Sequence, residues 1–191
     1  MDTSNLAHAW GCVGIAGRGL GSITGPSGSA TNPGSVERAA VAAFTRYVNA
    51  LGDLRRAPVR TRLAVLSALR ALTPAIDRSA CVAPTDRYGR RVLREDPAGW
   101  SLAAISLRYG QQTEAHDHDG WGGAVTVQGI ERDRRYRPND KGVLRPIGEH
   151  DYPPGSGYVF DPSDVHRPVG IFGEPERVVI PDPVSPAMPS P

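Results

Sequence analysis

Residues 113–125 read TEAHDHDGWGGAV, and this stretch decides the expected fold and its candidate site. His116 and His118 are one residue apart, so in an extended strand both side chains project from the same face. A tryptophan and three glycines follow them closely. Two interpretations fit the pair: the histidines share a metal ion inside a β-structure, or they are solvated side chains on an exposed strand.

Histidine is scarce in this chain, which makes the pair easier to judge. Only five are present, at His8, His116, His118, His150 and His166. A His-x-His pair arises by chance in roughly one such chain in eight, so the pair alone is a weak motif. Two imidazoles inside a barrel would need a partner, because an unpaired buried polar group is costly, and a metal supplies one. His8 in the glycine-rich leader and His150 in the turn-like GEHDYPPG are not expected to be ligands.

Length, charge and cysteine content narrow the class of protein. The 191 residues fit one domain and can bury a core without disulfides. A net charge of +2 implies no strong field for nucleic acid or a membrane, and the absence of about 18 consecutive apolar residues predicts no membrane span. Cys12 and Cys81 form no disulfide framework and favour a reducing, cytoplasmic setting. The start of the chain lacks the basic region of a signal peptide.

The chain divides by texture into a leader, a helical part and a β-rich part. Residues 1–34 are rich in Gly, Ser, Thr and Ala and are predicted to be a flexible segment. One domain is expected over 35–191. Within it the sequence predicts helices over 35–80, a β-barrel over 81–185 and a proline-rich tail over 186–191.

Two amphipathic helices are predicted in the first part of the domain. Ser35 is the expected N-cap and Gly52 the stop of the first helix, and Pro74 ends the second. Both helices should pack an apolar stripe on the β-structure. The stripes consist of Val36, Ala40, Phe44, Tyr47, Val48 and Leu51, and then Leu63, Leu66, Leu69 and Leu72.

After Cys81 the apolar pattern changes to period two, in short segments bounded by Gly, Pro or Asp. Many short strands with regular turns predict a sandwich or a small barrel. The mixed-charge run ERDRRYR at 131–137 is interpreted as a solvated strand edge. The segments are YGRRVLRED, WSLAAISLRYG, GGAVTVQGIERDRRY, GVLRPIG, GSGYVFDP and ERVVIPDPV.

The spacing of glycines and histidines resembles the cupin superfamily. Gly110 stands six residues before His116, and Gly122 stands four after His118. Downstream, GSGYVFDPSDVHRPVG gives a glycine turn, a strand, a proline turn and His166. The resemblance implies a mainly β fold, a small jelly-roll barrel whose two motifs deliver metal ligands to one interior site. Most cupins have glutamate at the position of Gly122, so the resemblance implies a site of three histidines: His116, His118 and His166.

A narrower resemblance extends over about residues 86–170. The run YGRRVLREDPAGWSLAAISLRYGQQTEAHDHDGWGGAVTVQGIERDRRY is similar to the cysteine dioxygenase family of thiol dioxygenases, in its bacterial branch. That family combines a Tyr-x-Arg strand, His-Asp-His and a Trp-Gly step, and helices stand upstream. The resemblance implies Fe(II) bound by the three histidines, with a small thiol and O2 as substrates.

The same resemblance assigns a substrate-binding role to Arg90. The matching arginine of the cysteine-using branch binds the substrate carboxylate, and a guanidinium suits a carboxylate bidentately. The alternative is a surface arginine on a strand, as its neighbour Arg91 illustrates. Tyr88 matches the family's tyrosine two residues earlier, although packing alone would also explain it.

The chain departs from the family after His166. The family carries a Ser-x-His-x-Tyr run on a late strand, where alignment of VSPA places Ile180, Asp182 and Val184. The loss of that run predicts a different reaction product, because residues around the metal ligands alter metal chemistry strongly. Tyr152, Tyr158 or Asp182 could replace the missing groups, but a structural role is the simpler explanation for each. Glycine at 122 and 123 also excludes a Cys–Tyr cross-link.

The expected function is an Fe(II)- and O2-dependent oxygenase that acts on the sulfur of cysteine or a related small thiol. The product would be a sulfinate or a further-rearranged compound such as a sulfonamide, which suits secondary metabolism. Two alternatives stay open. Three histidines can also hold zinc or nickel for other chemistry, and a non-catalytic cupin would bind a metal or a small ligand only.

Overall fold

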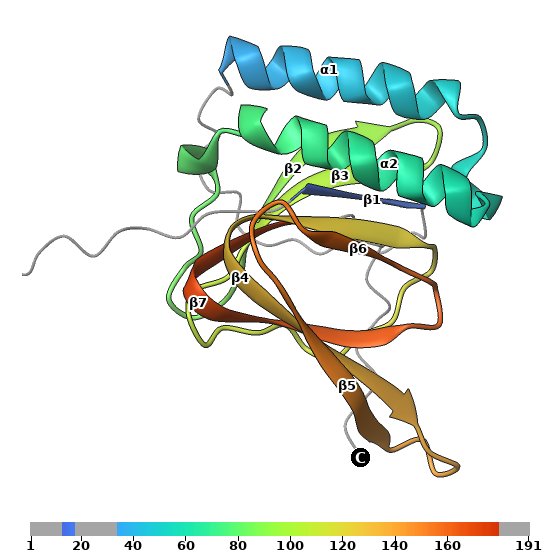
Figure 1. Ribbon diagram of the computed structural model, residues 1–191, viewed down its shortest axis with the longest axis vertical. Helices are drawn as coiled ribbons and strands as arrows, with labels where there is room; N and C mark the ends of the chain where they lie inside the picture. The colour runs from blue at the N-terminus through green and yellow to red at the C-terminus, as the bar shows by residue number, and fades with distance from the viewer. Residues whose placement is uncertain (1–12, 18–33, 180–191) are drawn as a thin grey trace, which may run out of the picture.

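Residues 13–17 and 34–179 are described by the computed structural model (Figure 1). Two helices, α1 (Ser35–Ala50) and α2 (Val59–Leu72), form a layer beside a larger body of strands. Short 3-10 helices connect these parts of the chain: η1 (Leu54–Arg56), η2 (Thr73–Ala75) and η3 (Arg78–Ala80).

The β-structure is one seven-stranded sheet in which every pairing is antiparallel. Its order is β1-β3-β7-β4-β5, with β2 paired to β3 and β6 paired to β4. The predicted fold class, mainly β with N-terminal amphipathic helices, is therefore confirmed. The strands are β1 (Val13–Gly17), β2 (Gly89–Asp96), β3 (Trp100–Ser106), β4 (Gly122–Pro138), β5 (Leu144–Tyr152), β6 (Gly157–Phe160) and β7 (Val165–Val179).

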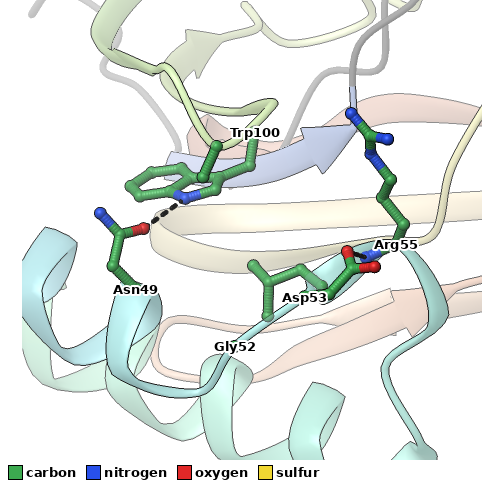
Figure 2. A pocket seen from close by; sticks show the side chains of 7 residues that line it. Asn49, Gly52, Asp53, Arg55 and Trp100 are labelled. Carbon is green, nitrogen blue, oxygen red and sulfur yellow. Dashed lines mark hydrogen bonds between the residues drawn. The ribbon is translucent and has the colours of Figure 1, made fainter.

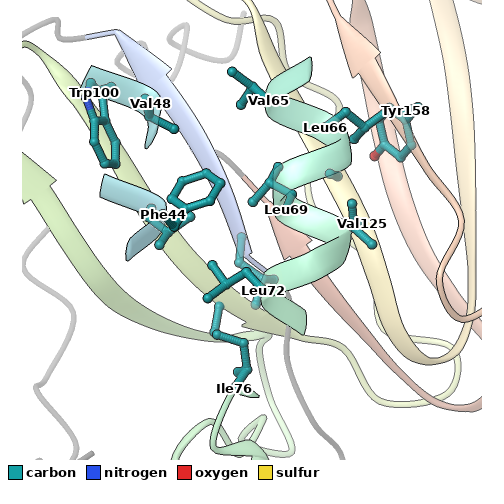
Figure 3. Close-up of a cluster of buried hydrophobic side chains, with 14 of the residues drawn as sticks. Phe44, Val48, Val65, Leu66, Leu69, Leu72, Ile76, Trp100, Val125 and Tyr158 are labelled. Carbon is teal, nitrogen blue, oxygen red and sulfur yellow. The ribbon is translucent and has the colours of Figure 1, made fainter. Parts of the chain in front are cut away.

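The helices pack on the sheet through part of their predicted stripes, as Figure 3 shows. The buried stripe residues are Phe44, Val48, Leu66, Leu69 and Leu72. Three other predicted members lie on the outside, since Val36, Tyr47 and Leu63 are 69%, 42% and 51% exposed. The stripes are thus narrower than the sequence suggested. Gly34, not Ser35, is the residue that caps α1.

Pairing across strands divides the sheet into a helix face and an opposite face. On β4, a Cβ at Gly123 would lie 3.6 Å from Leu66 of α2, so Gly123 and Val125 belong to the helix face. Gly122 and Ala124 therefore point the other way. Gly14 of β1 pairs with both Ala124 and Ala103, which places Ala103 of β3 on that opposite face as well.

The leader predicted to be flexible over residues 1–34 contains the strand β1. Its backbone pairs with β3 at Gly14↔Ala103 and with β4 at Val13↔Val125. Backbone pairing needs no alternating apolar pattern, which explains why the short VGIAG segment gave no strand signal among its glycines. Residues 1–12 and 18–33 of the leader, and the tail over 186–191, lie outside the described residues.

The stretch GEHDYPPG, predicted to be a turn, contributes to β5 instead. Apart from half-buried Tyr152, every residue of β5 is exposed. The sequence therefore lacks the alternation of apolar and polar residues that predicts a strand with one buried face. Ion pairs to β4 align it: Arg132 lies 2.6 Å from Asp151, and Arg134 lies 3.2 Å from Glu149. Within the described part of the chain, no helix is long and apolar enough to cross a membrane.

Candidate metal centre

The backbone brings the two predicted histidine motifs together. His116 and His118 lie on the segment between β3 and β4, and His166 lies near the start of β7. His116 and His166 form an isolated antiparallel bridge, in which each N–H donates to the other's carbonyl over 3.0 and 2.9 Å. The His118 N–H donates to the Pro162 carbonyl over 3.2 Å. His116 and His118 therefore do not lie in a regular strand. A bridge to β7 holds His116, and one hydrogen bond to the turn before β7 holds His118.

The three imidazoles face one another. Their ring centroids are separated by 5.0 Å for His116 and His118, 4.8 Å for His116 and His166, and 4.9 Å for His118 and His166. One nitrogen from each ring lies within 4.8 Å of the others, and His118 and His166 are buried. The three histidines thus form a group positioned to hold a metal ion.

Hydrogen bonds at the far side of two rings fix which nitrogen is offered to a metal. His116 Nδ1 lies 2.8 Å from the Glu114 carbonyl, and His166 Nδ1 lies 2.6 Å from Asp133 Oδ1. Both partners can only accept, so each Nδ1 carries the proton. The lone pair of each ring is then on Nε2. His118 and His166 already turn Nε2 toward each other, at 2.8 Å.

The residues present fit a divalent transition metal. Metal–nitrogen bonds of about 2.0–2.1 Å with angles between about 90° and 110° separate two ligand nitrogens by roughly 2.8–3.4 Å. The His118–His166 distance of 2.8 Å is at the lower end of this range, whereas the upper bound for the group is 4.8 Å. Small rotations of the rings would bring all three nitrogens to one ion. Imidazole ligands suit iron, zinc and nickel alike.

A partly buried ion network supports His166 from behind. Asp133, on β4, accepts the His166 bond and also pairs with Arg135, which donates to Asp164 over 3.0 Å. Burial raises the pKa of Asp133, but the hydrogen bond and charge of His166, together with Arg135, hold that pKa below its usual value. The carboxylate therefore stays charged, which keeps His166 oriented.

A second buried acid lies close to this network. The hydroxyl of Tyr158 donates to Glu131 over 2.9 Å, and both residues are buried. The Tyr158 ring meets the His166 ring edge-on, with centroids 6.0 Å apart, and the centroid of the Tyr152 ring lies 4.5 Å from that of Tyr158. Burial raises the pKa of Tyr152. Tyr158 therefore contacts the histidine group and Tyr152 contacts Tyr158, whereas Asp182 lies outside the described residues.

Sequence reasoning missed Glu131 and Asp133 because it interpreted ERDRRYR as a solvated edge. That interpretation is wrong: β4 pairs with both β5 and β7 along this run, and the two acids are buried. A signal was present. Glu131, Asp133 and Arg135 alternate with Arg132 and Arg134, and the period of two places the first three on one face of the strand.

Arg90 and Arg91 project from opposite faces of β2. Arg91 lies on the helix face, where it forms a bidentate pair with Glu37 at 2.7 and 2.8 Å. Arg90 pairs with Ile105, which shares the opposite face with Ala103. Arg90 is exposed there, and its guanidinium forms no ion pair among the residues that the structure describes.

The remaining predicted positions fall in three places. Tyr88 is half-buried just before β2 and packs against the hydrophobic core. His150 is on exposed β5, where it contacts Tyr152 and takes no part in the histidine group. His8, Ile180 and Val184 lie outside the described residues.

An open hollow of about 380 Å³ lies between the end of α1 and the β2–β3 hairpin (Figure 2). The Trp100 indole donates to Asn49 Oδ1 over 2.9 Å inside it. None of the three histidines lines the hollow, so it is separate from the candidate metal centre. The lining residues are Asn49, Gly52, Asp53, Leu54, Arg55, Ala98 and Trp100.

Comparisons with known proteins found distant similarity to solved structures only. No family model matches the chain, and no curated protein is similar to it. An RmlC-like cupin protein from Desulfovibrio desulfuricans is 18% identical with a TM-score of 0.40, over 53% of this chain and 89% of that one. A cupin superfamily protein from Desulfitobacterium hafniense is 13% identical with a TM-score of 0.32, over 56% and 83%. Likeness at this level assigns no activity.

Proposed function

We propose that this protein is an Fe(II)- and O2-dependent oxygenase of cupin type that oxidises the sulfur of cysteine or a related small thiol acid. The group of His116, His118 and His166 carries the proposal, since one nitrogen of each lies within 4.8 Å of the others. Three protein ligands leave other positions of the metal for substrate, as non-haem iron chemistry requires. Iron, when bound, supplies the oxygen chemistry.

In this proposal the neighbours of the histidines orient them toward the metal. Glu114 and Asp133 keep the Nδ1 protons of His116 and His166, so that Nε2 of each ring faces the metal. Asp133 also supplies negative charge behind one ligand, which raises the basicity of that imidazole. Burial of His118 and His166 keeps bulk water away from two of the three rings.

Arg90 is proposed to bind the carboxylate of the substrate. It lies on the face of β2 opposite the helices, with its side chain exposed. The neighbouring Arg91 has a structural partner in Glu37, whereas Arg90 has no ion pair among the described residues. A thiol acid could then join Arg90 to the metal through its carboxylate and sulfur.

The reaction would add both atoms of one O2 to the sulfur, which converts R–SH to R–SO2H with no other reactant. The Ser-x-His-x-Tyr run of the thiol dioxygenase family is absent here, so we expect a bulkier thiol than cysteine or a product beyond the sulfinate. A product beyond the sulfinate would form from it by loss of CO2, which replaces the carboxyl group by hydrogen and needs no second oxidant.

The test is anaerobic loading of the purified protein with Fe(II), followed by exposure to O2 with single thiols. We expect O2 uptake that depends on thiol, together with product masses increased by one O2 or decreased from that by CO2. Cysteine and cysteamine form the matched pair, because only cysteine has a carboxylate. Tight binding of metal without any thiol-dependent O2 uptake would support the non-catalytic alternative. Conversion of a thiol that persists when zinc replaces iron would support the alternative in which three histidines hold zinc or nickel for other chemistry.

A further inference from the structure

One aromatic ring lies directly against two of the candidate ligands. Phe160, the last residue of β6, stacks on His118 with centroids 4.1 Å apart and planes at 26°. Its centroid is 5.3 Å from that of His166. Only 1% of Phe160 is exposed, so the ring fills the space beside both imidazoles. A hydrocarbon ring offers no ligand atom and excludes water from that space.

The strand opposite Phe160 makes room for the ring by having no side chain. Gly122, the first residue of β4, is the direct pairing partner of Phe160. A Cβ at Gly122 would lie 2.1 Å from Cζ and 2.2 Å from Cε2 of the ring. Gly122 does not have a positive φ angle, so its backbone conformation does not require glycine. The ring alone accounts for the glycine.

We propose that Phe160 is a positioning residue of the metal centre, with Gly122 as its required counterpart. The ring holds the plane of His118 and closes the side beside His118 and His166 from which a further ligand or water would approach. The open positions of the metal are then restricted to the remaining sides. This inference rests on the proposed three-histidine metal site and concerns how many other ligands that site admits.

The experiment uses Co²⁺ alone as the probe, because its visible absorption reports coordination number without any turnover. The full chain is compared with Phe160→Leu, which keeps apolar bulk without a flat ring, and with Phe160→Ala, which empties the space. Gly122→Ala forces the ring to move. Gly123→Ala is the matched control, since its Cβ would face α2 on the other side of the same strand. Circular dichroism checks the folding of each variant.

We expect Phe160→Ala to weaken Co²⁺ binding by about 10–100-fold, the usual effect of losing a group that orients a ligand. Its visible bands should also weaken as water enters and the coordination number rises. Phe160→Leu should weaken binding less and leave the bands closer to those of the wild type. Gly122→Ala should lower the affinity more than Gly123→Ala does, and this loss should shrink in a Phe160→Ala background, where the overlap is absent.

The outcomes separate this inference from the proposed site. If the wild type binds no Co²⁺, or if binding survives replacement of the histidines, the metal site itself is wrong and this inference falls with it. If the wild type binds Co²⁺ through the histidines but Phe160→Ala and Phe160→Leu keep its affinity and spectrum, only the role of Phe160 is overturned. The two Phe160 variants decide the question even where Gly122→Ala does not fold.

Discussion

His166 donates its Nδ1 proton to Asp133 Oδ1 across 2.6 Å, and both side chains are buried. The acid lies 33 residues before the histidine in sequence and faces it from the neighbouring strand. This bond selects the tautomer and orientation of one candidate metal ligand.

Asp133→Asn should weaken metal binding by about 10–100-fold, because a neutral amide orients His166 less firmly and lowers its basicity. A competition titration with a coloured chelator measures the change. Asp164→Asn is the control, since Asp164 also pairs with Arg135, whereas the His166 bond goes to Asp133. Equal affinities for Asp133→Asn and the wild type would show that this acid does not support the site.

Replacement of His116, His118 or His166 by Ala should each remove most of the bound metal, because a two-imidazole site lacks the ligand number that these ions need. Metal content after dialysis, measured by mass spectrometry, checks this. His150→Ala on exposed β5 should keep the wild-type content. Full occupancy in the His166→Ala variant would overturn the three-histidine assignment.

Arg90→Gln should lower the specificity constant for cysteine about ten- to a hundredfold, the effect of losing a charged hydrogen bond of roughly 1.5–3 kcal/mol. Cysteamine, which has no carboxylate, should be used poorly by the wild type and be little affected by the substitution. Initial rates of O2 uptake with both thiols give the comparison. Equal use of the two thiols by the wild type would return Arg90 to the role of a surface residue.

Glu37→Gln should destabilise the fold by about 3–5 kcal/mol, since the largely buried Arg91 would lose its charged partner. Glu37 also accepts from the backbone N–H of Asp77, so it joins α1 to the connection before β2. Urea unfolding measures the loss. In the double variant Glu37→Leu/Arg91→Leu much of the stability should return, because no charge is then left unpaired. Additive losses would contradict the ion-pair explanation.

Asp96 should make folding stability depend on acid pH. Burial raises its pKa, but hydrogen bonds from the Ala98 N–H, Arg94 and Asn49 outweigh this and leave the pKa lowered. A carboxyl with a lower pKa in the folded state stabilises the fold above its unfolded pKa of about 3.9. That stabilisation is lost as the pH falls through the folded pKa.

Asp96→Asn should therefore be less stable than the wild type at pH 7, with a gap that closes as the pH is lowered below about 4. Urea midpoints at several pH values measure it, and Asp140→Asn at an exposed turn is the control. A gap that stays constant with pH would mean that the charge of Asp96 contributes nothing.

The sequence could predict the local elements and the histidines, since both depend on short-range patterns. Period 3.6 gave α1 and α2, period two gave most strands, and the His-x-His spacing gave the first pair of candidate ligands. The meeting of His116 with His166 depends on a bridge between residues fifty positions apart, which the resemblance implied and no local pattern could.

Other features depend on which neighbours a strand acquires. ERDRRYR has the composition of a solvated edge, yet pairing on both sides buries Glu131 and Asp133. Adjacent Arg90 and Arg91 must point to opposite faces of a strand, but only the pairing of β2 with β3 decides that Arg91 is the one on the helix face. Exposure of nearly the whole of β5 removed the alternation by which strands are recognised.

A metal ion held by the histidines would have a consequence for the dynamics of the chain. His118 and His166 are 48 residues apart, and the strands β4, β5 and β6 lie between them. An ion held by both would close this segment in the manner of a removable cross-link, which restricts the unfolded chain. Amide hydrogen exchange should therefore slow on metal binding at the ends of this loop, near His116 and Val165, and change least in α1 and α2.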